Sequence, residues 1–304
     1  MERQGTLGHL AALVTILIWG TTFISTKLLL TVFQPVEILF FRFLIGFFAL
    51  LLICPRRLTG TGRRQELTFA AAGLCGICLY YLLENIALTY TFASNVGVMI
   101  SISPFFTAML SHFVIKDGEK LRGQFFIGFA VAMTGICLIS FNGARLELNP
   151  IGDLLAVLAA FVWACYAVLT KRISSFGQPI LLTTRRVFLY GMLFMLPTLF
   201  FFDFQWGFAR FADPKNLFQI LFLGLGASAL CFVTWNFAVQ VLGAIKTSLY
   251  IYMVPVITAV ASVLVLHERV TPLACVGIVL TLTGLLLSER RTTAKEGKTN
   301  GLPE

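Results

Sequence analysis

Charged residues are scarce in this chain of 304 residues. Asp, Glu, Lys and Arg make up only 12% of it, hydrophobic residues make up 58%, and the mean hydropathy is +0.88. A soluble domain carries about a quarter charged residues, so this chain has too little polar surface to stay dispersed in water. The composition therefore excludes a soluble globular protein.

Several motifs that carry chemistry are also missing. The chain has no Gly-x-x-x-x-Gly-Lys-Ser/Thr phosphate loop, no paired-histidine metal motif and no nucleophile elbow. Among its seven cysteines the close pair Cys75 and Cys78 is followed by neither a second pair nor a nearby histidine. We therefore expect no direct ATP drive, no enzyme activity, no cofactor and no metal site, and we interpret the cysteines as packing residues.

Apolar runs recur along the whole sequence. Each has about 20 residues, the length of a helix that crosses the bilayer hydrocarbon. We predict an all-α membrane protein with ten transmembrane helices at 8–30, 36–54, 67–90, 93–115, 122–141, 150–172, 179–202, 216–241, 244–266 and 271–289. No stretch is left for a soluble domain, and the first run is too long for a signal peptide and lacks a small-residue cleavage site.

Positive charge is divided unevenly between the two sides of the predicted bundle. With both termini on the inner side, 14 of the 23 Lys and Arg residues lie in inner loops and tails, and five lie toward the outer side. This bias predicts cytoplasmic termini. The net charge of +9 is then explained by topology and by anionic lipid of the bilayer, and nucleic acid is not expected as a partner because there is no basic folded domain.

The first half of the sequence recurs in the second half. Matched pairs at offsets of 144, 151 and 149 residues include Trp19 and Trp163, Asn85 and Asn236, Pro104 and Pro255, and Gly128 and Gly277. The offset changes only in predicted loops. Each half, 1–146 and 147–304, holds five predicted spans, an odd number, so the second half must lie inverted in the membrane. Inverted repeats are typical of secondary transporters, whose substrate site lies at the repeat interface near the membrane midplane.

Four segments carry a resemblance to a known family. They are "LIWGTTFISTK" (17–27), "FFRFLIG" (40–46), "ALTYTFASNVGVMISISPFFTAMLSHFVIKDGEKL" (87–121) and "GAIKTSLYIYMVPVITAVASVLVLHERVTPLACVGIVLTLTG" (243–284). With the plan of five plus five spans, the sequence resembles the EamA-type members of the drug/metabolite transporter superfamily over almost its whole length. The resemblance implies movement of small metabolites, often amino acids, across a bacterial inner membrane, and export is the favoured direction.

One carboxylate, Glu84, lies within the third predicted span. An ionisable group at this depth is costly and should face the bundle interior or a wet cavity. Tyr80 shares its helix face and Tyr81 lies beside it. In one interpretation Glu84 lines a central cavity, where it exchanges a proton or pairs with a cationic group of the substrate. In the others it is locked in an ion pair with Arg42 or Lys27, or it extends outward to the headgroups.

The repeat predicts further residues around the same cavity. Glu84 is equivalent to Trp235, because each precedes a matched asparagine. The candidate substrate-binding residues are Trp19, Tyr80, Tyr81, Glu84, Asn85, Trp163, Tyr166, Ser228, Trp235, Asn236 and Tyr250. Aromatic rings around a cavity suit apolar or cationic ligands. The alternative is that the tryptophans only pack the helix interfaces.

Two prolines interrupt spans at matched positions. Pro104 and Pro255 each remove a backbone hydrogen bond inside an apolar run. Interrupted helices at matching positions of two halves indicate the moving or binding part of a transporter, so we predict hinges there. A kink that only shapes packing is the alternative.

These observations favour a secondary transporter for a small polar or amphipathic metabolite. We expect alternating access, with the site between spans one, three, four, six, eight and nine, and proton coupling through Glu84 is one interpretation. A membrane-embedded enzyme or sensor that uses the same cavity without transport is the competing class. The sequence leaves the oligomeric state, monomer or homodimer, open.

Overall fold

The computed structural model describes residues 2–90, 93–114, 123–140, 149–202, 204–266 and 271–289, and within these ranges it contains helices and no strands. The α-helices of the first half are α1 (Glu2–Leu29), α2 (Pro35–Ile53), α3 (Arg63–Gly73), α4 (Tyr80–Tyr90), α5 (Ala93–Ile100), α6 (Ser103–Val114) and α7 (Gly123–Ser140). Those of the second half are α8 (Pro150–Ser174), α9 (Ile180–Phe201), α10 (Pro214–Leu221), α11 (Cys231–Leu242), α12 (Ala244–Leu249), α13 (Met253–Leu266) and α14 (Pro272–Glu289).

Seven helical segments in the described part of the chain are long and apolar enough to cross a membrane. They are Gln4–Leu29, Pro35–Ile53, Arg63–Tyr90, Val96–Val114, Pro150–Ser174, Ile180–Phe201 and Pro214–Leu242. The shorter apolar helices Gly123–Leu138, Ala244–Thr258 and Cys275–Ser288 lie within the other three predicted spans. The chain is therefore a multi-pass membrane protein. The predicted bounds agree closely with the helices, although α1 begins at Glu2 rather than at residue 8.

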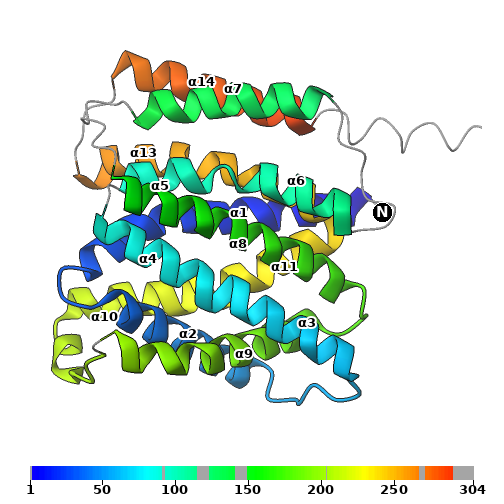
Figure 1. Ribbon diagram of the computed structural model, residues 1–304, viewed down its shortest axis with the longest axis vertical. Coiled ribbons are helices and arrows are strands. Elements are labelled where there is room, and N and C mark those ends of the chain that lie inside the picture. Colours follow the sequence, from blue (N-terminus) through cyan, green and yellow to red (C-terminus); the bar gives the residue numbers. More distant parts are fainter. Residues whose placement is uncertain are drawn as a thin grey trace, which may run out of the picture.

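The helices form a bundle with one closely packed pair at its end. Figure 1 shows α7 and α14 side by side at one end, α2 and α9 at the other, and α1, α4, α8 and α11 between them. Glycines allow α7 and α14 to approach, because a Cβ atom on Gly284 would lie 2.4 Å from the backbone nitrogen of Ala132. This pair packs against the bundle and leaves the central helices to build the site.

Two central helices contain π-helical segments at matched positions. The segment η1 (Leu74–Leu79) joins α3 to α4, and η3 (Phe222–Leu230) joins α10 to α11. Near each segment a matched glycine meets a neighbouring helix, since a Cβ atom on Gly73 would lie 2.6 Å from the carbonyl oxygen of Val187, and one on Gly224 would lie 2.7 Å from Cβ of Ile45. π-Helical turns are rare and often lie near functional sites. Here they immediately precede the α4 and α11 residues that approach the bundle centre.

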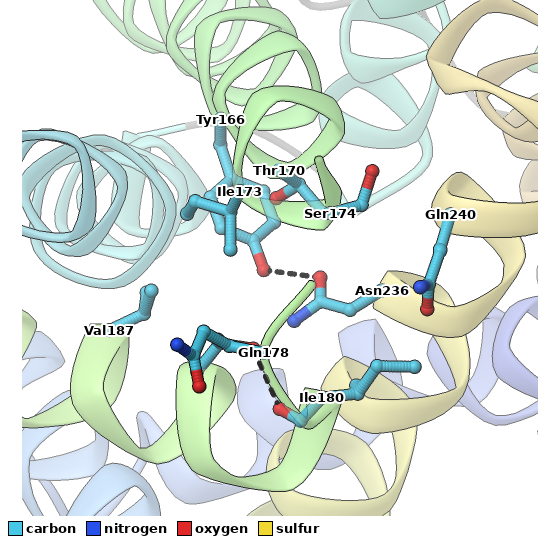
Figure 2. Close-up of a pocket in the computed structure, with 10 residues that line it drawn as sticks. Tyr166, Thr170, Ile173, Ser174, Gln178, Ile180, Val187, Asn236 and Gln240 are labelled. Atoms are coloured by element: carbon cyan, nitrogen blue, oxygen red, sulfur yellow. Dashed lines mark hydrogen bonds between the residues drawn. The ribbon is translucent and has the colours of Figure 1, made fainter. Parts of the chain in front are cut away.

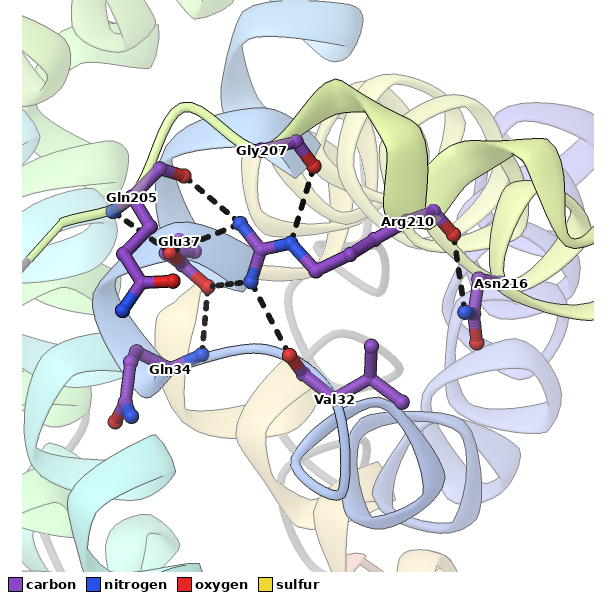
Figure 3. A network of polar contacts seen from close by, with 7 residues as sticks. All are labelled: Val32, Gln34, Glu37, Gln205, Gly207, Arg210 and Asn216. Atoms are coloured by element: carbon purple, nitrogen blue, oxygen red, sulfur yellow. Dashed lines mark hydrogen bonds and ion pairs between the residues drawn. The ribbon is translucent and has the colours of Figure 1, made fainter.

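One loop of the second half is held by Arg210, whose polar contacts are shown in Figure 3. Arg210 lies in the short 3-10 helix η2 (Phe208–Ala212) and pairs with Glu37 in the first turn of α2, with distances of 2.7 Å and 3.1 Å to its two carboxylate oxygens. Its other hydrogen bonds go to the carbonyl oxygens of Val32, Gln205 and Gly207. The loop between α9 and α10 is thereby attached to α2.

The loop between α2 and α3 is attached to α9 in a comparable way. Arg185 donates hydrogen bonds to the carbonyl oxygens of Cys54 and Arg56. Arg186 donates to the carbonyl oxygen of Leu58 at 3.1 Å and lies 3.6 Å from a carboxylate oxygen of Glu66. In both cases a helix of one half holds a loop of the other half.

Candidate functional site

A small buried cavity lies where α1, α4, α5, α8 and α13 meet. It has a volume of about 30 Å³ and is lined by Trp19, Thr22, Phe23, Tyr80, Tyr81, Glu84, Ile100, Trp163, Ile251 and Val254. Both halves of the chain contribute to the lining. Because a water molecule needs about 10–15 Å³ of such space, the cavity has room for about two waters. A metabolite can enter only when surrounding side chains or helices move.

Glu84 places a carboxyl group in this cavity. It lies on α4, one helical turn after Tyr80, and only 3% of its surface is exposed. The interpretation that Glu84 extends outward to the headgroups is therefore wrong. The ion pairs found among the described residues are Glu37 with Arg210 and Glu66 with Arg186, so Glu84 forms no ion pair with Arg42.

Arg42 and Lys27, the two cations considered as partners of Glu84, have other contacts. The Nε atom of Arg42 donates to the Ser228 hydroxyl at 3.0 Å, and its guanidinium lies 4.2 Å from the ring centroid of Tyr81. Lys27 donates to the carbonyl oxygen of Leu88 at 2.6 Å. Neither cation is among the described residues that line the cavity.

Aromatic rings form most of the remaining wall. The rings of Tyr80 and Trp163 are 4.8 Å apart, and those of Trp19 and Trp163 are 5.1 Å apart in an edge-to-face arrangement. The two matched tryptophans of the repeat therefore meet at the cavity. The indole N–H of Trp19 donates to the carbonyl oxygen of Ala227, whereas the buried indole N–H of Trp163 has no acceptor among the described residues.

Several other predicted site residues lie outside the lining. Trp235 packs beside the cavity, 5.1 Å from the Trp19 ring. The amide of Asn85 donates to the carbonyl oxygen of Pro35, and the hydroxyl of Tyr250 lies 2.6 Å from Nδ1 of His9. Together with Ser228, which accepts from Arg42, these residues connect helices rather than face the cavity.

Tyr166 and Asn236 line a second, uncharged pocket (Figure 2). The Tyr166 hydroxyl donates to the side-chain oxygen of Asn236 at 2.8 Å, and the amide of Asn236 donates to the Thr184 hydroxyl at 2.9 Å. The pocket is also lined by Thr170, Ile173, Ser174, Gln178, Ile180, Thr183, Val187 and Gln240. The Tyr166 ring lies 5.0 Å from the Trp163 ring, so Tyr166 stands between this pocket and the aromatic cavity.

The helices that carry Pro104 and Pro255 are interrupted next to the cavity. Helix α5 ends at Ile100 before α6 begins at Ser103, and the 3-10 turn η4 (Tyr250–Tyr252) separates α12 from α13. Ile100 and Ile251, each four residues before one of the prolines, both line the cavity. The predicted span 93–115 is thus interrupted by two turn residues, Ser101 and Ile102, just before Pro104.

Sequence reasoning missed some of the lining. Thr22 and Phe23 follow Trp19 by one helical turn, so a helical projection of the first span contains the signal that places them on the same face. Val254 carried no comparable signal. Phe232, which packs behind the lining against the rings of Trp19, Phe43 and Phe188, was missed as well, because its position looked like any other apolar residue of its span.

Comparison with known proteins gives a consistent picture. The model of the EamA-like transporter family matches residues 6–141 and 150–290. An uncharacterized transporter of Archaeoglobus fulgidus is 29% identical over 300 residues, covering 95% of this chain and 98% of the relative.

Two further relatives have names that describe a cargo. A probable terminal-alkyne amino-acid exporter of Streptantibioticus cattleyicolor is 27% identical, with 94% of each chain covered. A probable amino-acid metabolite efflux pump of Escherichia coli is 25% identical, covering 91% of this chain and 93% of the relative.

A solved crystal structure shares the fold, with a TM-score of 0.73 and 19% identity over 97% of this chain and 99% of the other. Both halves of the chain match the family model, and the apolar helices fit a membrane protein. The chain belongs to the EamA-like transporter family and is a multi-pass membrane transporter.

Proposed function

We propose that this protein is a secondary transporter that exports a small metabolite, an amino acid or a related compound, across the bacterial inner membrane by alternating access. The observation that carries the proposal is the cavity itself, where Glu84 lies among aromatic rings contributed by both halves. The names of the Streptantibioticus and Escherichia relatives support an amino-acid-like cargo and outward movement.

The transporter consists of two inverted halves, 1–146 and 147–304, with five spans each. Helix packing supports this plan, because α1 packs on α11 and α13 while its counterpart α8 packs on the counterparts α4 and α6. The matched π-helical segments η1 and η3 support it further. The excess of Lys and Arg on one side supports cytoplasmic termini.

Alternating access uses the two interrupted helices as hinges. The breaks before Pro104 and Pro255 lie beside the cavity, where a change in backbone angle alters the lining directly. The hydrogen bonds from Tyr166 to Asn236 and from Asn236 to Thr184 close one route into the cavity. Breaking them opens that route toward the uncharged pocket.

Glu84 couples transport to protons in this scheme. Its carboxyl group is buried and forms no ion pair among the described residues, and a proton or a cationic group of the substrate would stabilise it there. A site that binds a proton in one state and substrate in the other exchanges them across the membrane. Export is then driven by the inward proton gradient.

Counterflow in liposomes tests the proposal. Proteoliposomes loaded with unlabelled amino acids take up a labelled amino-acid mixture if the protein is a carrier. Glu84→Gln is expected to lose the response to an imposed pH gradient. Exchange that persists assigns Glu84 to the proton alone, whereas exchange that is lost by a folded variant assigns it to the substrate as well. Glu66→Gln is the matched control, because Glu66 is a partly buried carboxylate that bonds to Arg186 and Tyr190, away from the cavity. Folded wild-type protein without counterflow would contradict an amino-acid cargo.

A further inference from the structure

The cavity carries one carboxylate and no positively charged side chain in its described lining. Glu84 is the acidic lining residue, and the other lining residues are aromatic, aliphatic or hydroxyl-bearing. Arg42 is not a lining residue: it lies on the ring of Tyr81 and donates to Ser228. The one charged side chain that a ligand meets in the described lining is therefore negative.

The aromatic walls of the cavity also favour a positively charged ligand. The rings of Tyr80, Tyr81, Trp19 and Trp163 lie 4.7–5.1 Å from their neighbours around Glu84. Aromatic faces attract ammonium groups, and the attraction grows when water is removed, as it is in a buried cavity. Carboxylate and rings together form a site for an organic cation.

Trp163 adds a single uncharged donor. Its side chain is 2% exposed, it lines the cavity, and its indole N–H has no acceptor in the described structure. Buried donors normally have a partner, so a ligand oxygen is a natural acceptor. This one neutral N–H is not sufficient to compensate the desolvation of a carboxylate on the ligand, because a buried carboxylate needs a paired charge or several hydrogen bonds.

We propose that this site selects amine-bearing organic cations that lack a free carboxylate. The ammonium group pairs with Glu84 and packs on the rings of Tyr80 and Trp163, and an uncharged oxygen of the ligand accepts the Trp163 N–H. A zwitterionic amino acid is disfavoured because its carboxylate would be buried beside the carboxylate of Glu84, with no cation in the described lining to pair with it. The inference rests on the proposed function and narrows its cargo from amino acids and related compounds to amines.

Tryptophan fluorescence of the full-length protein in nanodiscs tests this selectivity. Three of its four tryptophans, Trp19, Trp163 and Trp235, lie at or beside the cavity. The probes are 2-phenylethylamine, phenylalanine, phenylacetate and 2-phenylethanol, which share one ring and differ in charge. We expect the amine to bind at least tenfold more tightly than the other three. Equal binding of phenylalanine, or no saturable binding of the amine by folded protein, overturns the proposal.

Variants of Glu84 separate charge recognition from folding. Glu84→Gln is expected to weaken amine binding at least tenfold with 2-phenylethanol binding unchanged, whereas Glu84→Asp keeps the preference for the amine. Glu66→Gln behaves as wild type. If Glu84→Gln binds the amine as tightly as wild type while its thermal unfolding is also unchanged, Glu84 does not recognise the cation and the proposal is wrong.

The same samples distinguish this inference from the transport proposal. Amino-acid counterflow that 2-phenylethylamine does not inhibit leaves the transporter in place and removes the amine site. Selective amine binding without counterflow of labelled amine or amino acid keeps the amine site and removes the carrier.

Discussion

The guanidinium of Arg210 and the carboxylate of Glu37 form a bidentate ion pair that joins the two halves of the protein. Glu37 is completely buried, and both of its oxygens are bonded, at 2.7 Å and 3.1 Å. Arg210 also lies 4.5 Å from the ring centroid of Phe33. It belongs to the loop in which the repeat offset grows from 144 to 151 residues. The anchor thus lies in a loop whose length differs between the two halves.

Glu37→Gln is expected to destabilise the protein strongly. The glutamine leaves the Arg210 guanidinium without its counter-charge, and breaking one side of a buried pair costs about 3–5 kcal/mol. Because Arg210 is partly exposed, we expect the loss in free energy of unfolding to lie near the lower end of this range. Thermal unfolding in detergent measures it. Lys215→Gln, at an exposed position five residues after Arg210, is the control. Equal melting of Glu37→Gln and wild type would show that the pair adds nothing.

Gly284→Ala is expected to loosen α14 from α7. The added methyl group would lie 2.4 Å from the backbone nitrogen of Ala132, and backbone cannot move aside as a flexible side chain can. Overpacking of this kind costs about 1–3 kcal/mol. Gly123→Ala on α7 is the matched control, because nothing lies within 4 Å of its added methyl group. The melting temperature should fall for Gly284→Ala alone, and an equal fall in melting temperature for both variants would contradict the packing argument.

Much of the fold and part of the site could be predicted from the sequence. Apolar runs of membrane-spanning length locate the helices closely, and the repeat together with helical periodicity brings Trp19, Trp163, Tyr80 and Glu84 to one cavity. Each of these signals comes either from neighbouring residues or from the match between the two halves of the sequence. Trp235 shows the limit, because its equivalence to Glu84 gives its helix face but not its depth, and its large indole packs beside Trp19.

Long-range polar partners were beyond sequence reasoning. Tyr250 bonds to His9, a residue 241 positions away, and Glu37 bonds to Arg210, 173 positions away. No periodicity or spacing links such residues, and their pairing depends on the final packing of the helices. The same holds for the chain of hydrogen bonds from Tyr166 to Thr184.

Tyr166→Phe is expected to make the cavity easier to open. It removes the hydroxyl that donates to Asn236 and leaves the buried amide oxygen without this partner, which costs about 1–3 kcal/mol in the closed state. In a background without the seven native cysteines, Ile100→Cys reports cavity access through its labelling rate with a membrane-impermeant thiol reagent. The rate should rise about fivefold or more. Tyr190→Phe, which removes a hydroxyl bonded to Glu66, is the control. Unchanged labelling in Tyr166→Phe would exclude this closure.

Pro104→Ala and Pro255→Ala test the hinges. Alanine restores a backbone N–H and favours a continuous helix, so each variant stiffens one of the two breaks beside the cavity. If the breaks bend during transport, counterflow slows severalfold while probe affinity measured by tryptophan fluorescence stays the same, and the double variant is slower than either single one. Pro197→Ala is the matched control, because Pro197 lies inside the uninterrupted helix α9. Variants that transport at the wild-type rate would leave the prolines as packing kinks, whereas slower transport with weaker probe binding would mean that they shape the site instead of moving it.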